Sequence, residues 1–110
     1  MSAITVPEEL LTEAKNFLDI TWTDESADKK LAGQIQRGIA YITGKTGVDA
    51  TSFSGDSIDY RAQELLFNYL LYDRAGALDQ FKKNYQSDIV GLRVRWEIDN
   101  HKGSTEGGIR

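Results

Sequence analysis

Cysteine is absent from this chain of 110 residues, and histidine and proline occur once each. Without cysteine there is no disulfide framework, no thiol nucleophile and no thiolate metal ligand, a composition compatible with a reducing compartment. The single histidine, His101, stands beside Lys102 in a glycine-rich stretch, where a solvated side chain is the simplest interpretation. Hydrolytic triads and most zinc sites are therefore disfavoured, and the stability of the fold must come from packing.

Long apolar runs are also missing. No stretch approaches the roughly 18 consecutive apolar residues that are needed to cross a bilayer, and residues 1–7 carry no basic cluster. We therefore expect a soluble protein that is made and kept inside a cell, with no membrane partner. At 110 residues the chain has the size of one ordinary domain.

Loops of the kind that bind phosphate or calcium are missing as well. The Gly-Lys-Thr tripeptide at 44–46 lacks the preceding glycine and strand of a phosphate-binding loop, so we predict the end of a helix there. The acidic segment after Asp49 fails the calcium-loop pattern, because Ser54 replaces its turn glycine and Tyr60 replaces its closing glutamate. We predict that the chain is not an enzyme and that it uses no cofactor and no metal.

The charge balance disfavours a nucleic-acid binder. Seventeen acidic side chains exceed thirteen basic ones, giving a net charge of −4, the opposite of what a phosphate-binding domain shows. The basic residues cluster weakly at Lys82 and Lys83, and again at Arg93 and Arg95 beside Trp96. A solvated helix face is the first interpretation of these pairs, contact with an acidic partner the second and nucleic acid the third. The one catalytic alternative is a pair of carboxylates acting as acid and base.

Apolar residues at helical spacing predict two helices in the first half of the chain. A short helix is expected over residues 7–18, and a longer one is expected to start after Thr23 or Asp24, either of which can cap it. Gly33 and Gly38 weaken this second helix, so each is either a point where another helix approaches or a tolerated surface glycine. The apolar stripe of the second helix consists of Leu31, Ile35, Ile39 and Ile42.

A loop over residues 44–57, ending in the candidate caps Asp56 and Ser57, precedes the third expected helix. Between Leu65 and Tyr72 this helix is apolar nearly all round, interrupted only by Asn68. Two interpretations stay open, a central core helix or a helix that is partly covered by a neighbouring subunit.

After Gly76, apolar residues from Leu78 to Trp96 recur at intervals of three and four, which predicts one long helix through about Arg95. The alternation of Val94, Trp96 and Ile98 would also suit a short strand. Residues 99–110 are glycine-rich and are expected to be a flexible tail. The predicted fold class is all-α, a small bundle of about four helices, with a single domain over residues 1–98.

Two stretches carry a resemblance to a known family. The first runs from Leu18 to Asp24 and leads into Asp28, Leu31, Ile35, Gly38 and Tyr41-Ile42. The second combines Leu65-Leu66, Tyr69, Tyr72-Asp73, Ala77 to Phe81, Asn84-Tyr85 and Ile89 to Leu92. In these patterns of hydrophobic and turn residues, residues 7–98 resemble the head-tail connector proteins of long-tailed bacteriophages, small helical adaptors that complete the head after DNA packaging.

The resemblance implies a structural virion protein, assembled in the host bacterial cytoplasm and located at the head-tail interface. Its copies would form a dodecameric ring under the portal, extend the channel for DNA without sequence-specific binding, and offer a surface to the tail-side stopper protein. By the same resemblance, subunit contacts are expected on the second and third helices and the portal contact near the C-terminus. The residues expected at subunit contacts are Ile35, Ile39, Phe67 and Leu71, and those expected at the portal contact are Arg93, Arg95, Trp96, Ile109 and Arg110.

The alternative prediction is a small phage DNA-handling or terminase-associated helical protein that binds nucleic acid directly. Its affinity for duplex DNA would fall steeply as the salt concentration rises. The net negative charge of the chain argues against it.

Overall fold

A computed structural model describes residues 6–21 and 24–108. Over these residues the chain is helical and contains no strand, which confirms the predicted all-α class. Five α-helices are present where about four are predicted, because the long helix expected after Gly76 divides at Tyr85. The elements are α1 (Glu8–Phe17), α2 (Glu25–Thr46), η1 (Ala50–Phe53), η2 (Gly55–Ser57), α3 (Tyr60–Arg74), α4 (Leu78–Asn84) and α5 (Gln86–Gly108), where η denotes a 3-10 turn.

Both ends of α2 follow from local chemistry. Asp24 caps the start, since its Oδ1 accepts a hydrogen bond of 3.0 Å from the Ser26 backbone N–H that the helix leaves unpaired. Gly47 ends the helix at φ 83°, a left-handed conformation that glycine adopts without steric cost. The tripeptide at 44–46 is therefore the C-terminus of a helix, as predicted.

The cap of α3 differs from the prediction. Asp59, not Asp56 or Ser57, is the N-cap, and its Oδ1 accepts hydrogen bonds from the backbone N–H groups of Arg61 at 3.0 Å and Ala62 at 3.5 Å. Asp56 and Ser57 lie instead in the 3-10 turn η2, which carries the chain into α3. Several residues of the loop have side chains that can cap a helix. The turn η2 places Asp59, and not Asp56 or Ser57, next to the unpaired backbone N–H groups at the start of α3.

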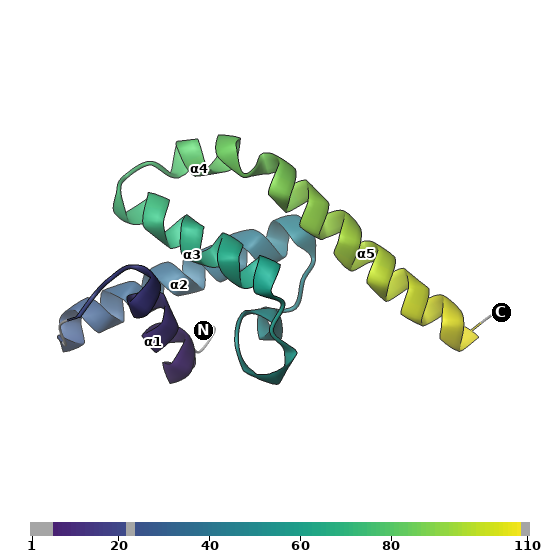
Figure 1. Cartoon of the computed structure of the whole chain (residues 1–110), viewed down its shortest axis with the longest axis horizontal. Helices are drawn as coiled ribbons and strands as arrows, with labels where there is room; N and C mark the ends of the chain where they lie inside the picture. The colour runs from purple at the N-terminus through teal and green to yellow at the C-terminus, as the bar shows by residue number, and fades with distance from the viewer. Residues whose placement is uncertain (1–5, 22–23, 109–110) are drawn as a thin grey trace.

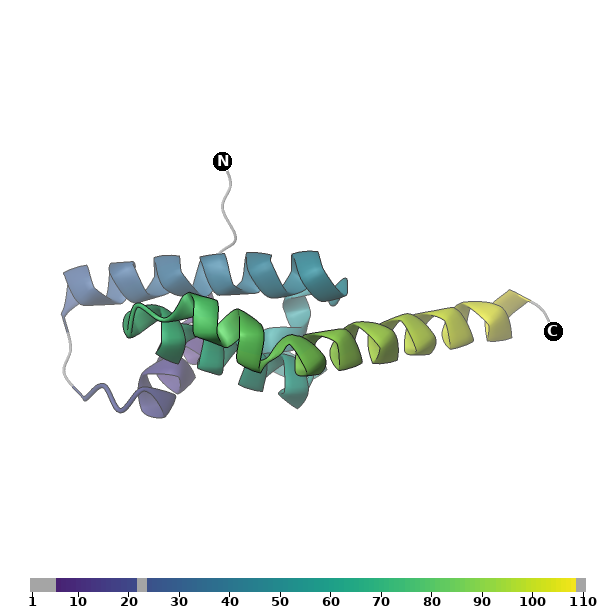
Figure 2. The same cartoon turned by 90° about the horizontal axis from the view of Figure 1, so that it is seen from above.

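The core is built around α3, which packs against α2, α4, α5 and η1. In Figure 1 α3 crosses α2 in the middle of the molecule, and in Figure 2 α2 lies along the upper side with α4 and the start of α5 in front of α3. The central position of α3 in the monomer therefore explains its apolar surface except at Leu71, which stays 46% exposed. The largest fully buried side chains are Phe53, Phe81, Leu10, Leu31, Ile35, Ile39, Ile42, Leu66 and Leu70.

Gly38 lies where α2 meets α3. A Cβ added there would approach Leu66 Cδ1 to 2.6 Å and Tyr69 Cδ1 to 2.9 Å, so only a residue without a side chain fits. At Gly33 an added Cβ would meet only the side chain of Arg37, at 3.8 Å. The close approach of a neighbouring helix therefore explains Gly38 and not Gly33.

The break between α4 and α5 is a single residue. Tyr85 has φ −110° and ψ 14°, outside helical values, although its N–H still donates to Phe81 O. Its ring stacks on Phe81 at 4.9 Å between centroids and meets Tyr72 edge-on at 5.8 Å. The apolar residues of α4 and α5 still follow one another at intervals of three and four across Tyr85, where this aromatic packing joins the two helices. The spacing in the sequence therefore does not reveal the break between the helices.

The helix α5 is longer than predicted and extends beyond the rest of the molecule (Figure 1). Its backbone is helical through Gly108, whereas the sequence predicted an end of the helix near Arg95. Once a packed stretch has formed the first turns, each further residue adds a hydrogen bond at little cost, so glycines do not by themselves end a helix. Ile109 and Arg110 lie outside the described residues, and the flexibility of the tail stays a prediction.

Candidate docking surfaces

The described side chains include no group of three or more His, Cys, Asp or Glu residues that could hold a metal ion. Among the same residues no helix has the length and apolar character required to span a membrane.

The outward side of α5 carries an apolar ridge, which we define as Val90, Val94 and Ile98. These side chains are 45%, 43% and 56% exposed, respectively. Their spacing of four residues places them on one side of the helix. The opposite side carries Ile89 and Leu92, both buried in the core. The helix α5 therefore has two apolar sides, of which the monomer covers only one.

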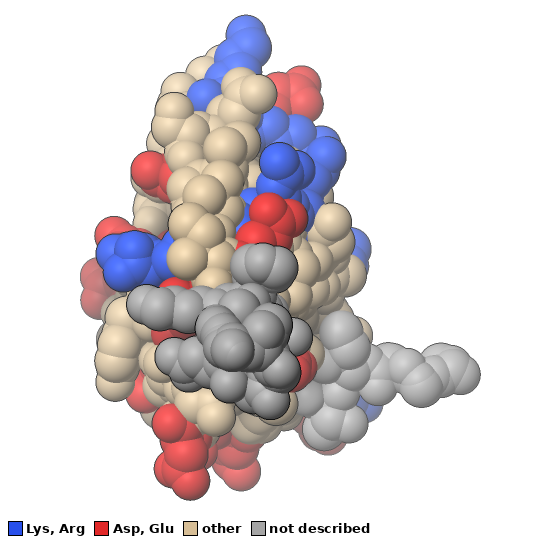
Figure 3. All heavy atoms as spheres, turned by 90° about the vertical axis from the view of Figure 1, so that its right-hand side faces the viewer, with Lys and Arg blue, Asp and Glu red and all other residues tan. Residues whose placement is uncertain are grey.

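A basic groove borders this ridge, between α5 and the C-terminal half of α2. It has a volume of about 460 Å³, and four cationic side chains from three helices contribute to its walls. Figure 3 shows Lys and Arg atoms gathered on the upper right of the face at the end of α5. The groove is lined by Tyr41, Lys45, Lys82, Lys83, Gln86, Ile89, Val90 and Arg93.

The cations of the groove have little internal neutralisation. Among the described side chains no carboxylate lies within ion-pair distance of its three lysines, and Arg93 has only Glu97 at 4.0 Å, one turn along α5. Lys45 and Lys82 instead lie over the ring of Tyr41, with Nζ at 5.8 and 5.5 Å from its centroid. In a chain of net charge −4 this groove is a local positive excess.

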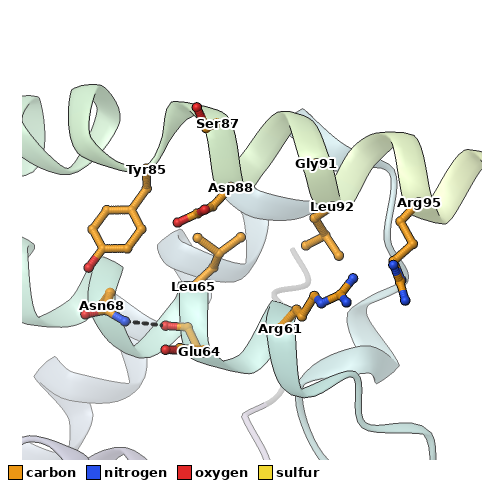
Figure 4. A pocket seen from close by; sticks show the side chains of 10 residues that line it. All are labelled: Arg61, Glu64, Leu65, Asn68, Tyr85, Ser87, Asp88, Gly91, Leu92 and Arg95. Carbon is orange, nitrogen blue, oxygen red and sulfur yellow. Dashed lines mark hydrogen bonds between the residues drawn. The ribbon is translucent and has the colours of Figure 1, made fainter.

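A second, mixed cleft lies on the other side of α5, against α3 (Figure 4). Arg61 and Arg95 approach one end of it from the two walls, and Glu64 and Asp88 lie nearer the end occupied by Tyr85. Burial, and next the neighbouring Tyr72 hydroxyl, raise the pKa of Tyr85 above its ordinary value of 10.0. The cleft has a volume of about 560 Å³ and is lined by Arg61, Glu64, Leu65, Asn68, Tyr85, Ser87, Asp88, Gly91, Leu92 and Arg95.

No match was found in comparisons with known protein families, curated proteins and solved structures.

The residues expected at subunit contacts differ in how far they are exposed. Ile35 and Ile39 are 0% and 2% exposed and belong to the core of the monomer, so they have no surface to offer another chain. Phe67 is 8% exposed and packs against the ring of Phe17, with 5.3 Å between centroids. Only Leu71, at 46%, keeps a large exposed area.

The residues expected at the portal contact are also separated. Arg93 lines the basic groove and Arg95 the cleft on the other side of α5. Trp96 points inward, where its Cδ1 would lie 3.7 Å from a Cβ added to Gly47. Ile109 and Arg110 lie outside the described residues. The three described residues, Arg93, Arg95 and Trp96, therefore do not form one patch.

The sequence analysis does not identify the apolar ridge or Lys45 as parts of a contact surface. The alternation of Val94, Trp96 and Ile98 would suit a strand, yet the segment is helical. In a helix Trp96 points to the core while Val94 and Ile98 belong to the outward side. Two interleaved apolar stripes within one helix would have been the indication of a second contact surface.

Proposed function

We propose that this protein is a structural head-tail connector of a long-tailed bacteriophage. In this role it binds the portal and the tail-side stopper protein, and its copies form a dodecameric ring around the DNA channel at the head-tail interface of the virion. The observation that carries the proposal is the uncovered apolar ridge on a helix that projects from an otherwise well-packed bundle. Such a ridge is typical of a chain that docks to other proteins.

The distribution of chemistry over the described residues supports a docking role. Two hollows in the surface lie on either side of α5, and each is lined by charged, polar and apolar side chains together. Arginine and aromatic side chains beside apolar area are typical of protein interfaces. An all-helical adaptor agrees with the resemblance of residues 7–98 to the connector family.

The experiment is co-sedimentation of the purified chain with cognate portal particles. Val94→Asp places a charge in the apolar ridge, and we expect it to reduce portal binding at least tenfold, equivalent to about 1.4 kcal/mol. Ala40→Asp is the matched control, since Ala40 is exposed on the side of α2 opposite the core. A wild-type chain that does not sediment with the portal would refute the proposal.

The C-terminal part of the portal contact has its own test. A chain truncated after Asp99 removes Ile109 and Arg110 together with the end of α5, and we expect it to bind portal particles less tightly than the full chain. Undiminished binding would remove residues 100–110 from the contact.

The basic groove favours one second candidate, a DNA-handling protein. Four cations around one hollow are what a phosphate backbone would need, although the net charge of −4 opposes it. A gel shift with duplex DNA at low salt separates the candidates. Binding that weakens steeply with salt and is lost in Lys82→Glu/Lys83→Glu would favour DNA handling.

A further inference from the structure

The ridge on α5 has the geometry of a helix-packing surface. Val90, Val94 and Ile98 follow one another every four residues, so their side chains form the kind of row that fits into the groove of a second helix. Ser87 and Gly91 lie on the same outward side, and a Cβ added at Gly91 would meet nothing within 4 Å. Small residues beside such a row let a second helix axis come close.

The charge beside the ridge defines what a second helix must carry. Val90 belongs both to the ridge and to the basic groove, so a helix seated on the ridge would place its flank over Lys45, Lys82, Lys83 and Arg93. Because the three lysines have no carboxylate partner among the described side chains, acidic residues on that flank would gain ion pairs without breaking existing ones. A basic flank would be repelled.

We infer that the ridge and basic groove together bind an amphipathic α-helix of another protein whose flank is acidic. The inference rests on the proposed docking function and names the chemistry of the partner segment. Nucleic acid fits less well, because phosphates would use the cations and leave the exposed Val94 and Ile98 uncovered. A second copy also fits less well, because a symmetric antiparallel pair of α5 helices would place two cationic flanks on the same side.

The test uses designed peptides and the full chain. One labelled peptide of about four helical turns carries Leu at every third and fourth position and Glu on its flanks, and a second replaces every Glu by Lys. By fluorescence anisotropy at low salt we expect the Glu peptide to bind with a micromolar dissociation constant and to weaken as salt rises. The Lys peptide is expected to bind at least tenfold more weakly.

Two variants and a matched control locate the binding. Val94→Asp places a charge in the ridge, and Lys82→Glu/Lys83→Glu reverses the charge of two groove residues. Each variant is expected to bind the Glu peptide at least tenfold more weakly than the wild type. Lys29→Glu/Lys30→Glu makes the same charge change at exposed positions in the first turns of α2 and is expected to leave binding unchanged. All these positions are exposed, so circular dichroism should show wild-type helicity throughout.

The contrary outcomes are distinct. Equal binding of both peptides, or binding that Val94→Asp does not change, overturns the inference. Self-association that Val94→Asp abolishes would assign the ridge to a second copy instead, and duplex DNA competing for the groove would assign it to nucleic acid. Portal particles that bind Val94→Asp normally would leave the connector function standing and remove this site from it. Binding of the Glu peptide by a chain that does not bind portal particles would support the helix-binding site and refute the connector function.

Discussion

Gly38 determines how closely α2 and α3 pack, because a methyl group there would overlap two buried side chains. Overpacking of this kind costs about 1–3 kcal/mol, against a gain of about 1 kcal/mol in helix propensity. Because Leu66 Cδ1 would lie only 2.6 Å away, we expect Gly38→Ala to lower the free energy of unfolding by about 1–2 kcal/mol. Urea denaturation followed by circular dichroism measures the change.

Gly33 is the matched control for this prediction. It lies on the same helix, and an added Cβ meets only the flexible side chain of Arg37. Gly33→Ala should therefore stabilise the chain by about 0.5–1 kcal/mol through helix propensity and the less flexible unfolded chain. Two variants that shift stability in the same direction would contradict the packing described at Gly38.

Tyr69 makes the stability of the fold sensitive to alkaline pH. Burial, and next the nearby carboxylate of Asp73, raise the pKa of its hydroxyl above the ordinary value of 10.0. The unfolded chain therefore loses this proton at a lower pH than the folded chain, so the free energy of unfolding falls as pH rises through 10 towards the folded pKa. Below that range both states are protonated and the contribution is constant.

The corresponding variant is Tyr69→Phe, which removes the titrating group and keeps the ring. Urea denaturation at neutral pH and at several values above pH 10 should show a shallower alkaline fall than in the wild type. Part of the fall should remain, because the pKa of Tyr85 is raised as well. An unchanged slope in the variant would show that Tyr69 does not contribute.

At the scale of elements, the start of α3 depends on one carboxylate. Asp59 accepts hydrogen bonds from two backbone N–H groups that the helix leaves unpaired, and Asp59→Ala should cost about 1 kcal/mol. Asp56→Ala is the control, since Asp56 is exposed in η2 and caps no α-helix. Thermal unfolding should show a lower midpoint only for Asp59→Ala. Equal losses would mean that net charge, and not capping, is responsible.

Much of the fold follows from patterns that a helix imposes on its own sequence. The stripe around Ile35 and Ile39 and the glycine after Thr46 are local features, and they predict α2 correctly. The choice of Asp59 over Asp56 and the break at Tyr85 depend on contacts between distant segments, such as the packing of Tyr85 on Tyr72. The spacing of residues along the chain does not determine the N-cap of α3 or the break at Tyr85, because more than one cap and more than one helix length fit the same spacing.

The candidate site was less predictable for the same reason. Lys45 and Lys82 are 37 positions apart and belong to one surface only because Tyr41 of α2 lies against Phe81 and Lys82 of α4. The roles of apolar residues also differ from those predicted. Ile35 and Ile39, expected at subunit contacts, are buried in the core, whereas Val94 and Ile98 are exposed. An apolar side chain in a sequence does not show which of two helix sides the rest of the chain will cover.

At the scale of the whole molecule, only the first half of α5 packs on the bundle, with the core on one side of the helix and the apolar ridge on the other. The N-terminal half of this helix packs on the bundle through Ile89, Leu92 and Trp96, and its C-terminal half extends beyond the bundle (Figure 2). Among the described side chains Trp96 is the last that packs against the core. The projecting part of α5 is thus available to a partner without any change in the bundle.

This arrangement predicts that removing the end of α5 leaves the fold intact. A chain truncated after Asp99 keeps every side chain that the structure places in the core, so its thermal midpoint should stay within a few degrees of the full chain. Its helical content should fall only by the removed turns, which circular dichroism measures directly. If the midpoint falls strongly, residues 100–110 stabilise the bundle, and a loss of portal binding in the truncated chain would then reflect unfolding. If the midpoint holds, the same loss locates a contact at the end of α5.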